Sequence, residues 1–198
     1  GDTPTQAQAA GMDAMIAGET SAEAAARTAM EIMRRGGGFS RIDMHHGAHA
    51  ERFLLGDMLY GYDTSAPKKG DMVRGWIQGP IFQGYWLDPG RTAVCAGRPT
   101  KEQRHILEGA TEVWKAIIKA IRPGVTPRQL GVIGQKTALR YAGDGIDLNL
   151  GIFGHQMGTF YGPHIIPAGD PGALDGEKIK QSTSVNERTS KEYEEIVE

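Results

Sequence analysis

One carboxylate, Asp88, stands in a run of mostly apolar and aromatic residues that extends from Gly79 to Thr92. An ionised carboxylate in an apolar setting must be held by a cation or by several hydrogen bonds. Arg91 or a metal ion is therefore a natural partner for Asp88. The sequence Asp-Pro-Gly is also ordinary turn chemistry, in which the acid bonds to its own turn. The spacing alone leaves both interpretations open.

Two histidines in the last third of the chain are candidates for metal binding or proton transfer. His155 lies between Gly154 and Gly158, where glycines let the backbone pass close to a ligand and leave the imidazole as the strong metal ligand. His164 stands between Pro163 and Ile165. A lone histidine among apolar residues is usually a hydrogen-bonded core residue, and this alternative stays open for both.

A further group of histidines, His45, His46 and His49, includes an H-x-x-x-H spacing. On a helix this spacing would place two imidazoles on one face. However, the group lacks the glutamate of the zinc-protease motif, and Gly47 lowers the helix propensity. We therefore predict a loop near a substrate pocket, with His49 as a candidate substrate contact.

The elements that position these residues include a repeated helical unit. A short helix over about 5–17 precedes Gly18, and Thr20 then caps a second helix that runs to Arg35, with Glu23 at the capping-box position. Gly18, Thr20 and Gly37 recur at one constant offset as Gly124, Thr126 and Gly143.

The second copy begins with a capping box formed by Thr100 and Gln103. The helix that follows has apolar residues at helical spacing, which predicts that they face the core: Ile106, Ala110, Val113, Trp114, Ile117, Ile118 and Ile121. Pro123-Gly124 ends this helix. Thr126, with Pro127 at the first helical position, starts the next helix.

Strands are predicted after each pair of helices. The first copy supplies a strand at 72–77 and a hairpin over 81–96, and the second a strand region at 152–166. Duplicated αα-ββ units predict an α+β fold with helices packed on one face of a curved antiparallel sheet. We expect one catalytic domain over 1–167, with halves 1–98 and 99–167, and a polar tail over 168–198.

Composition excludes several classes of function. The 198 residues are 39% hydrophobic, which suffices for a substantial core, and the net charge of -2 provides no basic face for nucleic acid. No apolar run is long enough to cross a bilayer, so we predict a cytoplasmic protein that does not bind a membrane. Cys95, in an apolar run, is predicted to be an inert core residue.

The motifs together resemble those of the pita-bread family M24, which includes methionine aminopeptidases, Xaa-Pro dipeptidases and creatinase. The resemblance covers roughly residues 10–167 and rests on the doubled helical unit, the hairpin with Gly84-Tyr85, Asp88 and Arg91-Thr92, the segment 121–126, and Gly154-His155 with Gly158. The amino-acid sequence of the hairpin is most similar to that of the branch that cleaves dimethylsulfoniopropionate to dimethyl sulfide and acrylate.

The resemblance implies a metal site. Of the two aspartates, one histidine and two glutamates of the family's dinuclear site, one aspartate corresponds to Asp88 and the histidine to His155, whereas the first aspartate falls on Ile77. His164 corresponds to a proton-handling or substrate-binding imidazole. The glutamates have no counterpart, so the second half is incomplete as written. A single divalent ion, iron, manganese or zinc, is expected rather than two.

Three functions follow as hypotheses. The first is a metal-dependent lyase in which Asp88 and His155 bind the metal and His164 or Asp88 handles a proton, while Trp76, Tyr85 and Trp86 offer aromatic faces to the sulfonium cation. The second is an M24-type hydrolase, either a peptidase or a metal-free creatinase-like enzyme. The third is a catalytically silent scaffold. The resemblance also implies a small-molecule substrate and a homodimer.

Overall fold

The computed structural model describes residues 3–51, 61–79, 81–141, 152–158 and 161–167. The chain divides into two compact units. The first comprises Gly1–Thr100 with Met157–Tyr161, and the second Lys101–Gln156 with Gly162–Glu198. The two units are described separately below.

Two helices open the first unit, α1 (Thr3–Ala17) and α2 (Ser21–Arg34). The predicted cap of α2 is confirmed, because Thr20 Oγ1 accepts a hydrogen bond from the N–H of Glu23 at 3.1 Å. The two helices pack closely at Gly11, where an added Cβ would lie 2.1 Å from Thr28 Oγ1. A glycine is therefore required at this helix crossing.

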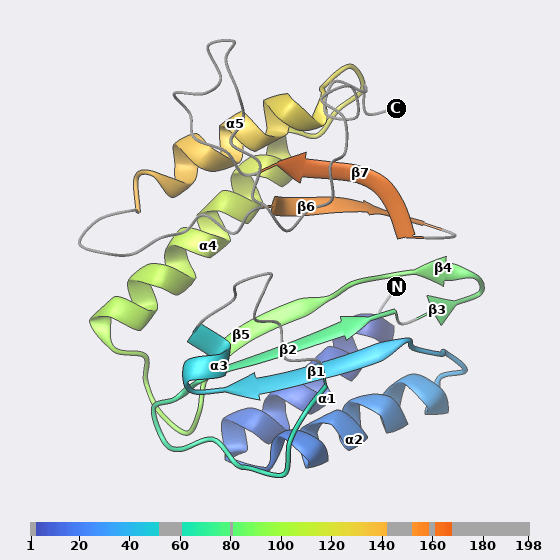
Figure 1. Cartoon of the computed structure of the whole chain (residues 1–198), viewed down its shortest axis with the longest axis vertical. Coiled ribbons are helices and arrows are strands. Elements are labelled where there is room, and N and C mark those ends of the chain that lie inside the picture. The colour runs from blue at the N-terminus through green and yellow to red at the C-terminus, as the bar shows by residue number, and fades with distance from the viewer. Residues whose placement is uncertain (1–2, 52–60, 80, 142–151, 159–160, 168–198) are drawn as a thin grey trace. The chain divides into compact units, whose positions relative to one another are not determined.

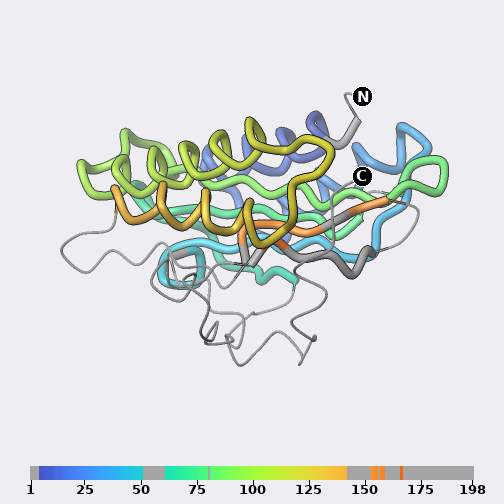
Figure 2. The backbone as a smooth tube through the Cα atoms, turned by 90° about the horizontal axis from the view of Figure 1, so that it is seen from above, coloured from blue at the N-terminus to red at the C-terminus, as the bar shows by residue number. Residues whose placement is uncertain are grey.

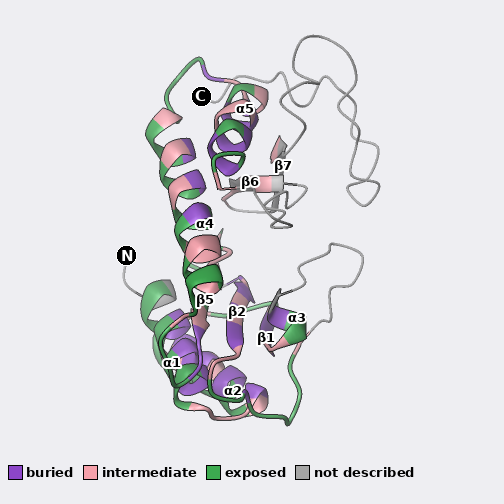
Figure 3. Ribbon diagram, turned by 90° about the vertical axis from the view of Figure 1, so that its left-hand side faces the viewer, coloured by how far each residue is buried: buried purple, intermediate pink, exposed green. Residues whose placement is uncertain are grey.

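A three-stranded antiparallel sheet lies against these helices, in the order β1 (Arg41–His46), β2 (Met72–Gln78), β5 (Gly90–Val94). Figure 1 shows α1 and α2 on one face of this sheet, and Figure 3 shows that they are buried where they meet it. The core between helices and sheet includes residues with at most 1% exposure: Met15, Ala24, Ile32, Met44, Val73 and Ile77. One sheet face is thus apolar, and the other is left for polar residues.

Shorter elements complete the first unit. A four-residue helix, α3 (Ala48–Glu51), follows β1 directly. The predicted hairpin divides in two: β3 (Ile81–Phe82) pairs with β4 (Tyr85–Trp86), and β5 then returns to pair with β2. The strand predicted at 72–77 is confirmed.

The second unit contains the helices α4 (Lys101–Ala120) and α5 (Pro127–Ala138), which lie side by side (Figures 1 and 2). As predicted, α5 starts after Thr126 with Pro127 in its first turn. The structure adds a reciprocal capping box between Thr126 and Gln129. After α5, β6 (Ile152–Met157) pairs with β7 (Tyr161–Pro167), and both strands belong to this unit except for Met157 and Tyr161. A second core includes Val113, Ile117, Val125, Leu130 and Ala138.

One prediction for α4 is wrong. Ala110, Trp114, Ile118 and Ile121 were expected in the core, but Ala110 is exposed and the other three are 62%, 50% and 44% exposed. The buried residues of α4 are Gly109, Val113 and Ile117, a narrow stripe at i, i+4 and i+8. Trp114 and Ile118 each lie about 100° further round the helix than a residue of this stripe, so they fall outside its contact with α5.

No helix among the described residues is long and apolar enough to cross a membrane. The predicted polar tail, 168–198, lies outside the described residues.

Candidate functional site

The sheet face turned away from α1 and α2 carries polar side chains. In an antiparallel sheet, directly paired residues point to the same side. Asp43 pairs with Trp76, and His45 pairs with Arg74, which pairs in turn with Thr92. Together with Arg41, which alternates with Asp43 along β1, they form what we term the polar face: Arg41, Asp43, His45, Arg74, Trp76 and Thr92.

A partly buried ion pair lies on the polar face. Asp43, 2% exposed, accepts hydrogen bonds from Arg41 Nε at 2.8 Å and from the N–H of Gly61 at 2.5 Å. Burial lowers the pKa of Arg74, and the negative charge of Asp43 opposes this shift by raising it. Asp43 therefore satisfies its charge within the protein, as a buried carboxylate must.

Arg41 also covers one side of an indole ring. Its guanidinium carbon lies 4.9 Å from the ring centroid of Trp76, within the range of a cation–π contact. The Arg41 side chain is 26% exposed. Stacking on Trp76 and bonding to Asp43 together fix a positive charge at the surface of the polar face.

Asp88 lies at the edge of this arrangement, after β4 and before β5. Its Oδ1 accepts a hydrogen bond from the indole N–H of Trp76. The sequence had suggested Arg91 or a metal as the partner, but Arg91 Nη1 donates to the carbonyl of Gly90 at 2.7 Å. One partner of Asp88 is thus an uncharged donor from the neighbouring strand.

The first aspartate of the family's site was expected at the position of Ile77. In the structure Ile77 is fully buried in the core on the helix side of β2. Its neighbour Trp76 points to the polar face, pairs with Asp43 and contacts Asp88. The β2 residue that faces Asp88 is therefore Trp76.

The other two predicted aromatic contacts lie on the short β3–β4 hairpin. Tyr85 is 61% exposed, and Trp86 is partly buried. They are adjacent in one strand, so their side chains point to opposite sides. Their role as substrate contacts stays a prediction.

The three clustered histidines separate in space. His45 lies in β1 on the polar face and is 7% exposed, whereas His46, the next residue, points to the opposite side. His49 lies exposed in α3, beyond a turn at Gly47 with φ of +57°. The H-x-x-x-H spacing therefore spans a strand, a turn and a short helix, and does not form one helical face.

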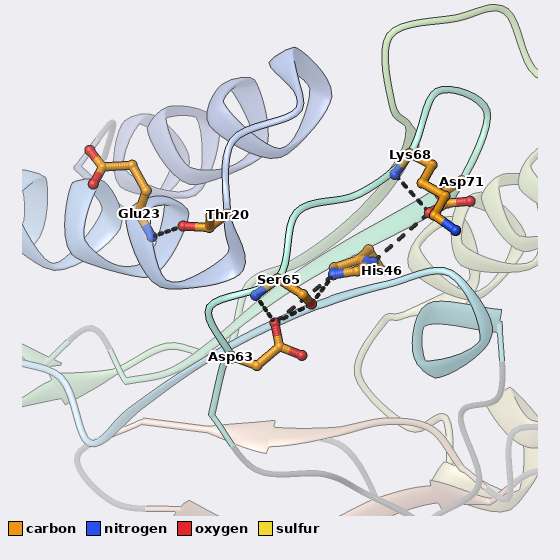
Figure 4. Close-up of polar contacts among 7 residues, drawn as sticks. All are labelled: Thr20, Glu23, His46, Asp63, Ser65, Lys68 and Asp71. Carbon is orange, nitrogen blue, oxygen red and sulfur yellow. Dashed lines mark hydrogen bonds and ion pairs between the residues drawn. The ribbon is translucent and has the colours of Figure 1, made fainter.

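His46 belongs to a separate polar network near the start of α2 (Figure 4). His46 Nε2 lies 2.8 Å from Ser65 Oγ, and Ser65 donates its hydroxyl to Asp63 Oδ1 at 2.6 Å. The side-chain hydrogen bond from Ser65 is the main cause that lowers the pKa of Asp63 below 3.8. On the other side of the ring, His46 Nδ1 lies 3.9 Å from Asp71 Oδ2.

Two predicted site residues follow α5. His155 lies partly buried in β6, and His164 lies in β7. Both belong to the second unit, whereas Asp88 belongs to the first. The predicted metal-binding pair of Asp88 and His155, and the proton-handling role of His164, stay predictions.

Among the described residues of the first unit, the donors beside Asp88 do not form a metal centre. Among the residues described, no three His, Cys, Asp or Glu side chains lie close enough to hold a metal ion. The other carboxylate of the polar face, Asp43, is bound by Arg41. A dinuclear site needs several oxygen and nitrogen donors in fixed geometry, and this set does not supply them.

Sequence reasoning missed Arg41, Asp43 and Arg74. A signal was present, because charged and apolar residues alternate strictly from Arg41 to Met44, as they do in a strand with one buried face. The charged side chains of this strand therefore share one side of the sheet.

Comparison with solved structures identifies the fold. Prolidase from Pyrococcus furiosus is 24% identical, with a TM-score of 0.67, and the match covers 83% of this chain and 47% of that one. X-Pro aminopeptidase from Thermotoga maritima is 18% identical, with a TM-score of 0.66, over 84% and 45%. Dipeptidase PepE from Mycobacterium ulcerans is 24% identical, with a TM-score of 0.64, over 85% and 46%.

These similarities confirm the predicted α+β pita-bread fold, and the chain spans about half the length of these relatives. No curated protein matches the chain. The branch that cleaves dimethylsulfoniopropionate is not among the structures named above. A family model described as metallopeptidase family M24 matches residues 5–182, and the chain therefore belongs to this family.

Proposed function

We propose that this chain is part of an M24-type hydrolase that cleaves an amide-type C–N bond in a small substrate bearing a carboxylate. Xaa-Pro dipeptides are the first substrates to test, because a matching solved structure is an Xaa-Pro dipeptidase from Bacillus anthracis. The observation that supports the proposal is the guanidinium of Arg41, fixed between Trp76 and Asp43 on the polar face that Asp88 adjoins.

Arg41 is proposed to bind the substrate carboxylate. A guanidinium offers planar N–H donors that suit a carboxylate, and one that is already ordered loses less conformational entropy on binding. Trp76 and Asp43 provide that order through the cation–π contact at 4.9 Å and the hydrogen bond at 2.8 Å. This arrangement favours a substrate that presents an anion near Asp88.

Asp88 is proposed to be the general base. Its carboxylate would take a proton from the water that attacks the scissile carbonyl carbon, and would return the proton to the leaving nitrogen as the C–N bond breaks. His155 and His164 of the second unit keep their predicted roles as metal-binding and proton-handling or substrate-binding residues. The proton transfer involves Asp88, the attacking water and the leaving nitrogen.

The sulfonium lyase is the weaker candidate. A sulfonium cation at Trp76 would be repelled, because one side of this indole already faces the guanidinium of Arg41. Tyr85 and Trp86 on the hairpin stay candidates for such a contact.

The test is an assay of the purified chain on Met-Pro and Ala-Pro, with and without added Mn²⁺, Zn²⁺ or Fe²⁺. We expect free proline from the wild type, and a rate lower by about 10²–10⁴-fold in Asp88→Asn. Asp13→Asn, which changes an exposed acid on α1, is the matched control and should keep the wild-type rate. Arg41→Gln should raise KM more than it lowers kcat.

Two results would overturn the proposal. Release of dimethyl sulfide from dimethylsulfoniopropionate without any proline release would favour the lyase. A folded protein inactive on both substrates would favour the silent scaffold. The predicted homodimer stays a prediction, which light scattering on the same preparation would check.

A further inference from the structure

The strand register decides which residue of β2 faces Asp88. Ile77 pairs with Ile42 and donates its N–H to the carbonyl of Pro89 at 3.1 Å, while its side chain lies fully buried on the helix side. Trp76, one residue earlier, points to the other side. A metal ligand that faced Asp88 from β2 would therefore have to stand at position 76.

Trp76 offers the wrong chemistry for such a ligand. An indole N–H is a donor only, with no lone pair to give to a metal ion. In this chain it donates to Oδ1 of Asp88, the kind of oxygen that a carboxylate would give to a metal. The indole N–H of Trp76 thus occupies a carboxylate oxygen of Asp88 that would otherwise be available to a metal ion.

The charges nearby also oppose a divalent cation. The guanidinium of Arg41 lies 4.9 Å from the Trp76 centroid, and the buried guanidinium of Arg74 is on the same face. Asp43 offsets part of this charge, but it is bound to Arg41 Nε and to the N–H of Gly61. A cation placed beside Asp88 would meet positive charge on the side of Trp76.

We propose that Trp76 takes the place of a metal ligand in the first unit, so that the indole N–H, instead of a divalent ion, orients Asp88. Trp76 is then a positioning residue for Asp88. The proposal rests on the assignment of Asp88 to the proposed active site, but its test measures metal binding without substrate.

The main experiment is a Mn²⁺ titration of the purified chain, followed by electron paramagnetic resonance. Wild type and Asp88→Asn should bind Mn²⁺ equally, since Asp88 is not a ligand. Trp76→Asp places a second carboxylate opposite Asp88 and should bind Mn²⁺ at least about tenfold more tightly than the wild type. The double variant Trp76→Asp, Asp88→Asn should lose this gain. Trp76→Phe, which keeps an aromatic ring, is the matched control and should show no gain.

A second measurement tests the indole–carboxylate bond directly and does not depend on whether Trp76→Asp folds. The indole ¹H–¹⁵N signal of Trp76, assigned by its loss in Trp76→Phe, should move in Asp88→Asn. The indole signal of Trp114, exposed on α4, should stay in place.

The proposal is overturned if the wild type binds one Mn²⁺ that Asp88→Asn weakens, or if the Trp76 signal does not respond to Asp88→Asn. Peptide hydrolysis that needs an added metal, with equal Mn²⁺ binding by wild type and Asp88→Asn, would place the metal elsewhere and leave this proposal intact. Absence of hydrolysis would count against the proposed function alone.

Discussion

Gln8 of α1 donates its side-chain amide to the main-chain carbonyl of Gly75 in β2, at 2.9 Å. Gln8 is 2% exposed, so this polar contact lies inside the apolar layer between helix and sheet. A Cβ at Gly75 would lie 2.8 Å from Gln8 Nε2 and 2.9 Å from the sulfur atoms of Met12 and Met44. The missing side chain at Gly75 thus lets α1 approach the strand that carries Trp76.

We expect Gln8→Ala to destabilise the protein by about 1–3 kcal/mol, because it removes a buried hydrogen bond and leaves a small cavity. Urea unfolding followed by circular dichroism measures the change. Gln6→Ala, at an exposed position of the same helix, is the control and should stay within about 0.5 kcal/mol of the wild type. Equal losses in both variants would show that the buried bond is not the cause.

Local signals predicted much of the helical structure. Thr20 and Thr126 stand at the helix starts that their capping patterns indicated, because a cap depends on residues within one turn of the chain. The exposure of Trp114 was not predictable in the same way. Apolar spacing marks a broad face of α4, whereas the part that is buried depends on the elements packed against it.

The candidate site was predictable only in part. Asp88 stood out because it is an acid among apolar residues, but its partner Trp76 depends on how β5 pairs with β2. A shift of one residue in this register would exchange Trp76 and Ile77 between the two faces. No local pattern fixes that choice, so the sequence could not identify which side chain faces Asp88.

The hydrogen bonds of Ser65 predict how Asp63 responds to acid. Because the folded-state pKa of Asp63 lies below 3.8, its ionised form adds stability above that pH, and this stability is lost as the pH falls through the folded-state pKa. Ser65→Ala removes the main cause, so the pKa of Asp63 should rise toward 3.8. A ¹³C NMR titration of the Asp63 carboxyl measures this shift.

Thr64→Ala, at an exposed neighbouring position, is the control for this titration and should leave the pKa of Asp63 unchanged. The stability advantage of the wild type over Ser65→Ala should also become smaller at the lowest pH values, where Asp63 is protonated, while the contact of Ser65 with His46 is lost at every pH. A pKa that is the same in wild type and Ser65→Ala would show that another group holds Asp63.

Cys95 should be unreactive in the folded protein. Its side chain is fully buried, and burial, with a smaller effect of Asp71, raises the pKa of the thiol. Only the thiolate is strongly nucleophilic, so reaction with Ellman's reagent at pH 8 should be at least about 100-fold slower in buffer than in denaturing urea. Equal rates in the two solutions would contradict the burial of Cys95.

Gly134 should be as intolerant of a side chain as Gly75, because an added Cβ would again meet packed side chains. It lies in α5, where a Cβ would come within 2.6 Å of the ring of Phe153 and 2.8 Å of Ile117 Cδ1. Alanine favours a helix over glycine by about 1 kcal/mol, but overpacking a core costs about 1–3 kcal/mol. We therefore expect Gly134→Ala to lower the free energy of unfolding.

The cause can be tested with a second substitution. Phe153→Leu removes the ring that the new methyl group would meet, so it should cost less stability in the Gly134→Ala background than in the wild type. Lys136→Ala, exposed on the same helix, controls for helix propensity alone and should change stability by less than about 0.5 kcal/mol. Additive effects of Gly134→Ala and Phe153→Leu would mean that the two positions do not contact each other, because coupling is expected only between neighbours.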